Sequence, residues 1–257
     1  MTTTALIVQY LDDLLDTRGV PDYPNALNGL QLANDGSVTR IAAAVDFSLR
    51  TVTAAAEAGA NLLIVHHGMF WSGLKPISGI SFARIQTLIQ KNIAVYSSHL
   101  PLDRHSLYGN NALLAAELQL EPSGEFARFR TIFIGVSGES DIATTDIAKR
   151  ADTFARSHGG SVRTTPIMSG RRTRNWAICT GAGASAETLS EARECGIDTL
   201  IVGEGPHHSA VDADESGIAV IYAGHYATET LGVRALAAHT SDRFDVPWTF
   251  IEAPTGL

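Results

Sequence analysis

The feature that most constrains the fold is a segment that occurs twice. "EAGANLLIVHHG" (Glu57–Gly68) aligns without gaps on "ECGIDTLIVGEG" (Glu194–Gly205). In each copy a helix-like stretch stops at a glycine and a continuous apolar run follows, which is typical of a strand covered by helices on both faces. A second pair, "NIAVYSSH" (Asn92–His99) and "GIAVIYAGH" (Gly217–His225), follows at a similar spacing with one residue inserted. The sequence therefore predicts two related α/β halves.

We expect each half to contain a mixed sheet flanked by helices, with a metal site at the carboxyl ends of the strands, between the halves. The repeat is too long for a solenoid. The composition changes near "EPSGEF" (121–126), which we interpret as a linker. We therefore predict a metal-binding domain of residues 1–122 plus 223–257, and a second, related domain of residues 123–222.

Charge and composition exclude several classes of protein. A formal net charge of −8 argues against general nucleic-acid binding, which needs a surplus of Lys and Arg. Arg171, Arg172 and Arg174 form the densest basic cluster, which we interpret as a solvated loop. No apolar run approaches the roughly 20 residues needed to cross a bilayer. Cys179 and Cys195 form neither a disulfide framework nor a CxxC knuckle, so we expect a cytoplasmic protein.

Histidines and carboxylates gather after the predicted strands. Ligands of open α/β sheets bind beyond the carboxyl ends of the strands, so these positions are the candidates for a site. In chain order they are His66, His67, His99, Asp103, Glu204, His207, His208, His225 and Glu229. Seven of the nine histidines lie in this set or within one turn of it. Surface histidines would not favour strand ends.

This set of donors predicts a metal centre, since histidine and carboxylate together bind zinc, iron or manganese. His225 and Glu229 are four residues apart and share one face of a helical turn. His66 and His67 point to opposite faces within a strand, but just past its end they can diverge and hold two different ions. Asp103 is a natural bridging carboxylate between two metals roughly 3.5–4 Å apart.

Each part of this set also has a simpler explanation. A pair of adjacent histidines is more often structural or at the surface than a ligand. The HxxxE spacing occurs by chance in many helices, and Asp103 could cap a helix. We interpret His105 and His239 as solvated. The metal hypothesis is favoured because all of the donors fall on one predicted edge.

Three segments resemble those of a known family. "VHHGMFW", "SSHLPLDRHSLYGNNALLA" and "AGHYATETLGVRAL" are similar to the signature segments of the Nif-three-like family and occur in the same order. "NGLQLAN" and "GEGPHHSAVDADESGIAVIYAGH" extend the resemblance over most of the chain. Members of this family are often named GTP cyclohydrolase I type 2 homologues, or dinuclear metal-centre hexameric proteins.

The resemblance implies two divalent ions per subunit, of unknown identity, and a set of metal ligands. These ligands are His66, His67, Asp103, His225 and Glu229. It also implies a toroidal homohexamer, a trimer of dimers, whose metal sites face an internal cavity. The family's "TG(D/E)" turn reads "VGEG" here, so the acidic position is kept. We expect Glu204, His99 and His208 near the site, where they shuttle protons or contact substrate.

We expect a metal-dependent hydrolase that uses two divalent ions to activate a water molecule. Its substrate would be nucleotide-like, a cyclic amide or a phosphoester. The family name suggests opening of a guanine nucleotide ring, but the chain has no P-loop and no guanine-reading motif. The alternative is a non-catalytic ring that stores, delivers or senses metal, or serves as a scaffold. We predict no membrane partner.

Overall fold

The computed structural model describes residues 2–257, which divide into two compact units. The first comprises the chain up to Leu102 together with Gly232–Ala253, and the second comprises Asp103–Leu231 with Pro254–Leu257. The domain bounds expected from the sequence stay a prediction, and Asn110–Glu117 packs into the core of the second unit. Within the described residues, no helix is both long enough and apolar enough to cross a membrane.

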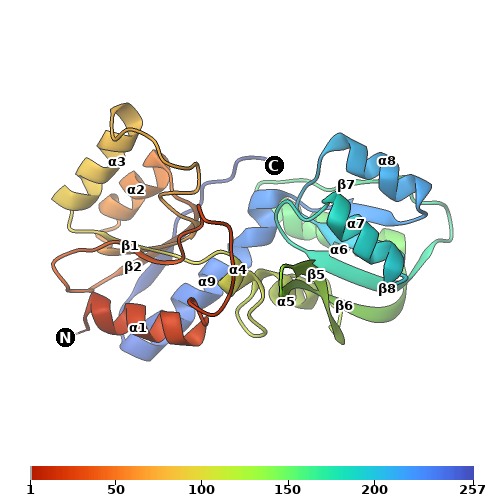
Figure 1. Cartoon of the computed structure of the whole chain (residues 1–257), viewed down its shortest axis with the longest axis horizontal. Coiled ribbons are helices and arrows are strands. Elements are labelled where there is room, and N and C mark those ends of the chain that lie inside the picture. The colour runs from red at the N-terminus through yellow and green to blue at the C-terminus, as the bar shows by residue number, and fades with distance from the viewer. Residues whose placement is uncertain (1) are drawn as a thin grey trace. The chain divides into compact units, whose positions relative to one another are not determined.

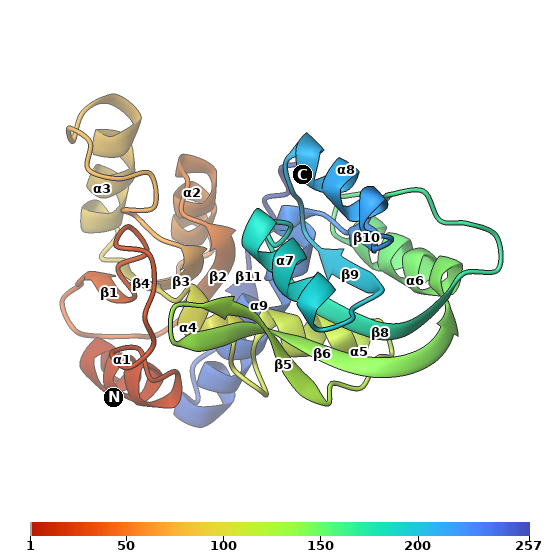
Figure 2. The same cartoon turned by 45° about the vertical axis from the view of Figure 1, so that its right-hand side comes forward.

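The first unit is built on one mixed sheet with the strand order β1-β4-β3-β2-β11 (Figure 1, with all five strands labelled in Figure 2). β1 is antiparallel to β4, and the other neighbours are parallel. Its elements are α1 (Thr4–Leu14), β1 (Gly29–Leu32), β2 (Ile41–Asp46), α2 (Leu49–Glu57), β3 (Leu62–His67), α3 (Gly79–Gln90), β4 (Ala94–Ser97) and β11 (Trp248–Phe250). The short helix α4 (Leu100–Asp103) ends at the first residue of the second unit, and α9 (His225–Phe244) begins in the second unit and continues into the first.

Alternation along the strands sends side chains to both faces of this sheet. Ala42, Leu63 and Val95 pack with Val52 of α2 and Leu88 of α3 in one core. Figures 1 and 2 show α1 and the later part of α9 on the opposite face. Helices thus cover both faces, which explains why these strands read as continuous apolar runs.

The second unit is built on a sheet with the order β5-β6-β8-β9-β10-β7. The pairs β8–β9 and β9–β10 are parallel, and the other pairs are antiparallel. Its elements are α5 (Asn110–Glu117), β5 (Gly124–Phe129), β6 (Ile132–Ala143), α6 (Thr144–Ser157), β7 (Arg163–Thr164), β8 (Arg172–Cys179), α7 (Ala186–Glu194), β9 (Thr199–Val202), α8 (His207–Glu215) and β10 (Ala219–Tyr222). The prediction of two mixed sheets flanked by helices is confirmed.

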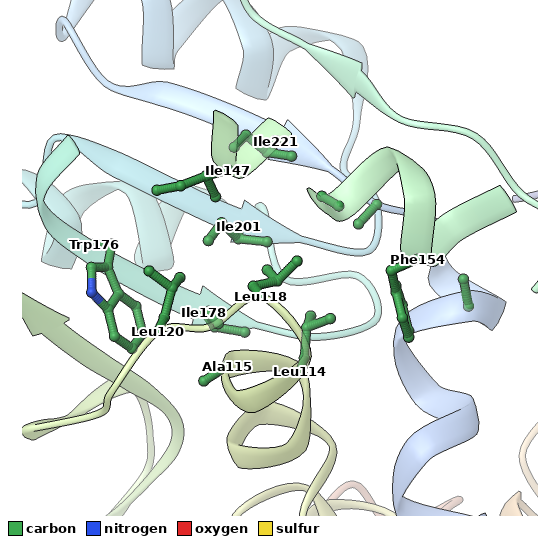
Figure 3. Close-up of a cluster of buried hydrophobic side chains, with 13 residues drawn as sticks. Leu114, Ala115, Leu118, Leu120, Ile147, Phe154, Trp176, Ile178, Ile201 and Ile221 are labelled. Carbon is green, nitrogen blue, oxygen red and sulfur yellow. The ribbon is translucent and has the colours of Figure 1, made fainter. Parts of the chain in front are cut away.

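Two cores lie on opposite faces of this second sheet. On one face, Trp176, Ile201 and Ile221 pack against Leu114 of α5 and Ile147 of α6 (Figure 3). On the other face, Ala177, Leu200 and Val220 of the strands pack in one core with Leu189 of α7 and Ala213 of α8. The period of two along β8, β9 and β10 therefore assigns each side chain to one core or the other.

The turns that lead from helix to strand repeat in the two units. α2 is followed by Gly59 with φ 70°, and α7 by Gly196 with φ 67°. A left-handed residue at this position ends a helix, and glycine adopts it without a steric penalty. In both turns, the N–H of the residue after the glycine bonds to the carbonyl five residues earlier, at 3.0 Å in the first unit and 2.8 Å in the second. The sequence repeat is therefore also a repeat of backbone structure.

Two interpretations of polar residues are wrong. The segment of Arg171, Arg172 and Arg174 is no solvated loop, because Arg172 begins β8 and pairs with Asp141, while the Arg171 guanidinium donates to carbonyls at the starts of neighbouring strands. His239 is half-buried, and its Nε2 lies 2.6 Å from the hydroxyl of Tyr10. Arg171, Arg172 and His239 therefore form hydrogen bonds within their own units.

We expect Gly138→Ala to lower the free energy of unfolding by about 1–3 kcal/mol, as overpacking does elsewhere. A Cβ at Gly138 would lie 2.5 Å from Cζ2 of the buried Trp176 and 2.7 Å from the carbonyl of Glu121. Denaturant unfolding would measure the change. Gly160→Ala is the matched control, since its nearest contact would be an ordinary 3.4 Å. Equal stability of the two variants would contradict the prediction.

Candidate metal centre

Three histidines come together at one edge of the first sheet. His66 and His67 end β3, and His99 follows the neighbouring parallel strand β4, so the carboxyl ends of two strands deliver them to the same edge. Each offers one ligand atom, and these atoms all lie within 4.8 Å of one another. The three side chains are buried, with at most 7% of their surface exposed. This group could hold a metal ion.

Each of these histidines has an acceptor beside its Nδ1 atom. The pairs are His66 with the carbonyl of Ser98 at 2.9 Å, His67 with Oδ1 of Asp46 at 2.8 Å, and His99 with Oδ1 of Asp22 at 2.9 Å. An acceptor at Nδ1 keeps the proton of a neutral imidazole on that atom, which leaves the lone pair of Nε2 for a metal. Backbone and carboxylate partners thus favour the same tautomer in all three rings, with Nε2 as the metal-binding nitrogen.

Asp22 is the most heavily bonded of these acceptors. Besides the His99 ring, its carboxylate accepts from the backbone N–H groups of Leu100 at 2.9 Å and Tyr23 at 2.6 Å, and from the side-chain amide of Asn28 at 2.8 Å. Burial raises the pKa of the Asp22 carboxyl, but the hydrogen bonds from His99 and Asn28 and the charge of His99 lower it more. The carboxylate is therefore ionised at neutral pH and fixes His99 to the loop before β1.

The second unit holds its own pair of donors at the start of α9. His225 is the first residue of that helix and Glu229 lies one turn later, with Nε2 of His225 3.2 Å from Oε1 of Glu229. Oε1 of Glu204 lies 2.7 Å from Nδ1 of the same imidazole. Burial lowers the pKa of His225, but hydrogen bonds and charge from Glu229 and Glu204 outweigh it and raise the pKa to about 9. This site concentrates negative charge around one imidazole.

Glycine allows the loop after β8 to approach this pair. Gly181 has φ 63°, its N–H donates to Oγ1 of Thr228 at 3.1 Å, and its carbonyl accepts from the N–H of Glu204 at 2.8 Å. A Cβ at Gly181 would overlap Oε1 of Glu229 and lie 3.4 Å from Nε2 of His225. The space in front of these two donor atoms therefore exists because residue 181 is a glycine and has no side chain.

Asp103 lies at the end of α4 and is 7% exposed. Its Oδ1 accepts from the amide of Asn110 at 2.8 Å, and its carbonyl accepts from the amide of Asn111 at 3.2 Å. Burial raises the pKa of the Cys179 thiol to about 12, and the charges of Asp103, Glu191 and Glu229 add to this effect. Two of the predicted ligands in the second unit, Asp103 and Glu229, thus both raise the pKa of this buried thiol.

The structure gives the other predicted residues different surroundings. His99 belongs to the histidine trio, and Glu204 supports His225. His208 lies exposed in the first turn of α8. The catalytic role assigned to these three residues from the sequence stays a prediction.

Asp46 and Asp22 are two site residues that the sequence pattern did not predict. Asp46 ends β2 and satisfies the strand-end criterion that found the histidines. Asp22 lies in a loop that follows α1, and no local pattern marks it.

The fold and donors define a class: a mixed α/β protein of two units whose histidines and carboxylates could hold metal. The family model Duf34/NIF3 (NGG1p interacting factor 3) matches residues 2–255, and the chain belongs to this family. A protein of Deinococcus radiodurans named GTP cyclohydrolase 1 type 2 homolog is 40% identical over 257 residues, covering 98% of this chain and 93% of its own length.

Solved structures agree with this assignment. Protein ybgI, described as of unknown function, has a TM-score of 0.89 and 31% identity, covering 99% of this chain and 100% of its own. TTHA1606 from Thermus thermophilus has a TM-score of 0.82 and 33% identity, with the same coverage. The resemblance to the family predicted from the three signature segments is confirmed.

Proposed function

We propose that this protein is a metal-dependent hydrolase with two divalent ions per subunit. Its ligands in this proposal are His66, His67, Asp103, His225 and Glu229. The observation that carries the proposal is the set of acceptors at Nδ1 of His66, His67 and His225, which leaves Nε2 of each ring for a metal, with release of the second proton of His225 when the metal binds. Proteins orient metal-binding imidazoles with such acceptors, which are a backbone carbonyl for His66 and carboxylates for His67 and His225.

The donors fit borderline divalent ions such as zinc, iron or manganese. Imidazole nitrogen and carboxylate oxygen suit these metals, whereas the thiol of Cys179 is protonated and buried. His99 also has an acceptor at Nδ1, like the other two histidines of its unit, and offers one further donor of the same kind. Bound ions would supply Lewis-acid activation of water and of a substrate oxygen.

The residues around these donors have separable tasks. Asp46 and Asp22 hold His67 and His99 in place, and Glu204 does so for His225. In our proposal, Glu204, His99 and His208 also carry protons or contact substrate. The name of the Deinococcus radiodurans relative, GTP cyclohydrolase 1 type 2 homolog, favours a nucleotide ring as substrate, and cyclic amides and phosphoesters suit the same chemistry.

We expect His66→Ala and Glu229→Ala each to lower the metal content of the purified protein and any hydrolytic activity together. Elemental analysis and calorimetric metal titration would measure the loss. His158→Ala is the matched control, because His158 bonds within α6 and to its own neighbours. Unchanged metal content in both variants would contradict the assignment.

The double variant tests whether the two donor sets serve one centre. If they share their ions, the losses of metal-binding free energy in His66→Ala and Glu229→Ala couple by more than about 0.5 kcal/mol. Additive losses would mean that each set binds metal independently. A turnover screen of metal-loaded protein with nucleotides, phosphoesters and cyclic amides then tests hydrolysis. Tight metal binding without turnover would favour the non-catalytic ring.

We further propose a homohexamer in the cytoplasm. Large apolar side chains on α3 and the loop before it are exposed, which supports a protein interface there. They are Leu74, Ile77, Ile80, Phe82 and Ile89. The two cysteines form no disulfide, which fits a reducing compartment. Light scattering of the purified protein would measure the number of subunits, and a monomer would contradict the proposal.

A further inference from the structure

An aromatic side chain adjoins the histidine trio of the first unit. Trp71 lies in the turn after β3, and its N–H donates to the carbonyl of Gly68 at 3.3 Å. Its ring centroid lies 4.6 Å from that of His67 at an interplanar angle of 33°, and 4.5 Å from that of His99 at 60°. Trp71 is only half-buried, so part of the indole is open to solvent. A ring that stacks on it would lie beside the metal donors.

Tyr23 supplies a second aromatic wall. Its ring centroid is 6.4 Å from that of Trp71, with the two planes at 86°, and 6.0 Å from that of His99. Half of the tyrosine surface is exposed, at 51%. Trp71 and Tyr23 therefore form two perpendicular walls, the aromatic corner, at the edge where the histidines end their strands.

Hydrogen bonds hold the two loops of the aromatic corner together. The side chain of Gln31 accepts from the N–H of Met69 at 2.6 Å and donates to the carbonyls of Ala26 and Leu27 at 3.0 and 2.9 Å. It occupies the space in which a Cβ at Gly68 would lie. One side chain thus connects the loop that carries Trp71 with the loop that carries Tyr23.

The Tyr23 loop is also fixed to His99. Oδ1 of Asn28 accepts from the N–H of His99 at 2.8 Å, and Asp22 accepts from the ring of the same residue. The aromatic corner is therefore organised by the same contacts that orient a metal donor. Such preorganisation reduces the entropy lost when a ligand binds.

We propose that the aromatic corner binds a flat nitrogen heterocycle, of purine or pteridine type, with its face on Trp71 and its edge against Tyr23. Aromatic rings pair in offset-stacked and perpendicular arrangements with centroids 4.5–7 Å apart, and the aromatic corner offers one wall for each. The loops 20–28 and 68–74 contain no Lys or Arg. Lys75 is the first basic residue after these loops, so in this proposal the corner recognises the ring and needs no phosphate. This inference rests on the proposed function, and it names the chemical class of its substrate.

The test titrates metal-loaded protein with adenosine, which has a flat ring and no phosphate, and with ribose 5-phosphate, which has no ring. Calorimetry and tryptophan fluorescence would follow binding. Saturable binding of adenosine alone is expected. Trp71→Leu is expected to weaken it at least about tenfold, and Tyr23→Leu several-fold, as for other stacking side chains. Trp248→Leu, a tryptophan of β11 at the far edge of the same sheet, should leave binding unchanged.

Metal content, measured on each variant, separates this inference from the proposed function. Wild-type protein that retains its metal but binds no adenosine, or binds ribose 5-phosphate equally well, overturns the aromatic corner alone. Failure of the wild type to take up metal overturns the proposed function, and adenosine is then titrated against the metal-free chain. If Trp71→Leu loses its metal, Tyr23→Leu decides: undiminished adenosine binding in that variant contradicts the proposal.

Discussion

Gly181→Ala is expected to lower the affinity for metal by at least about tenfold, a loss comparable to that from misplacing a ligand. The new methyl group would overlap Oε1 of Glu229 and press toward Nε2 of His225. Glu229 is 2% exposed and has little free space into which to turn. The methyl group therefore removes one donor without changing any donor residue. Calorimetric titration with Zn²⁺ or Mn²⁺ would measure the affinity.

Gly196→Ala is the matched control for this experiment. Gly196 has nearly the same φ as Gly181, 67° against 63°, but a Cβ there would meet nothing within 4 Å. Both variants pay the same backbone strain, of about 1 kcal/mol for a residue forced into the left-handed region. We expect similar losses of unfolding free energy from this strain and a loss of metal affinity in Gly181→Ala alone. Equal affinities would contradict the role given to this glycine.

Asp22→Ala is expected to lower the free energy of unfolding by about 3 kcal/mol and to weaken metal binding as well. The substitution leaves the donors of His99, Leu100, Tyr23 and Asn28 without their shared acceptor, and each buried donor that loses its partner costs about 1–3 kcal/mol. The ring of His99 also loses the contact that fixes its orientation. Denaturant unfolding and metal titration would measure the two effects.

Asp46→Ala separates these two effects. The Asp46 side chain is 37% exposed and has one ring contact, with His67, whereas that of Asp22 is 7% exposed. We expect a stability loss of at most about 1 kcal/mol in Asp46→Ala, because solvent reaches the site. The weakening of metal binding should be of the same order in both variants, about tenfold or more. A larger stability loss in Asp46→Ala than in Asp22→Ala would contradict this account.

Much of the fold follows from local patterns. The apolar runs of β2, β3 and β9 and the glycines that end α2 and α7 are local signals, and the structure has strands and helices where they predict them. β5 and α8 lack such a signal. β5 begins at Gly124, inside the segment interpreted as a linker, because its pairing with β6 is a tertiary contact. α8 buries only Ser209 and Ala213, so its sequence shows no apolar stripe.

The candidate site likewise contains residues that a local pattern predicts and residues that only tertiary contacts bring together. His66, His67 and His99 were found because parallel strands deliver their carboxyl ends to one edge, and this rule needs no knowledge of the other contacts. Asp46 obeys the same rule. Asp22 does not, because it is 77 residues from His99 in the chain and reaches the ring through a loop. Trp71 and Tyr23 likewise become neighbours only when Gln31 joins their loops.

The sequence by itself determined the family, the two related α/β halves and the residue types that could bind metal, because strand ends, helix caps and signature segments are local features of the chain. The tertiary structure decided which acceptor orients each imidazole and where glycine must leave space, as at Gly181. It also decided that two perpendicular aromatic rings stand beside the histidines. These properties depend on distances between residues far apart in the chain, which no local pattern encodes.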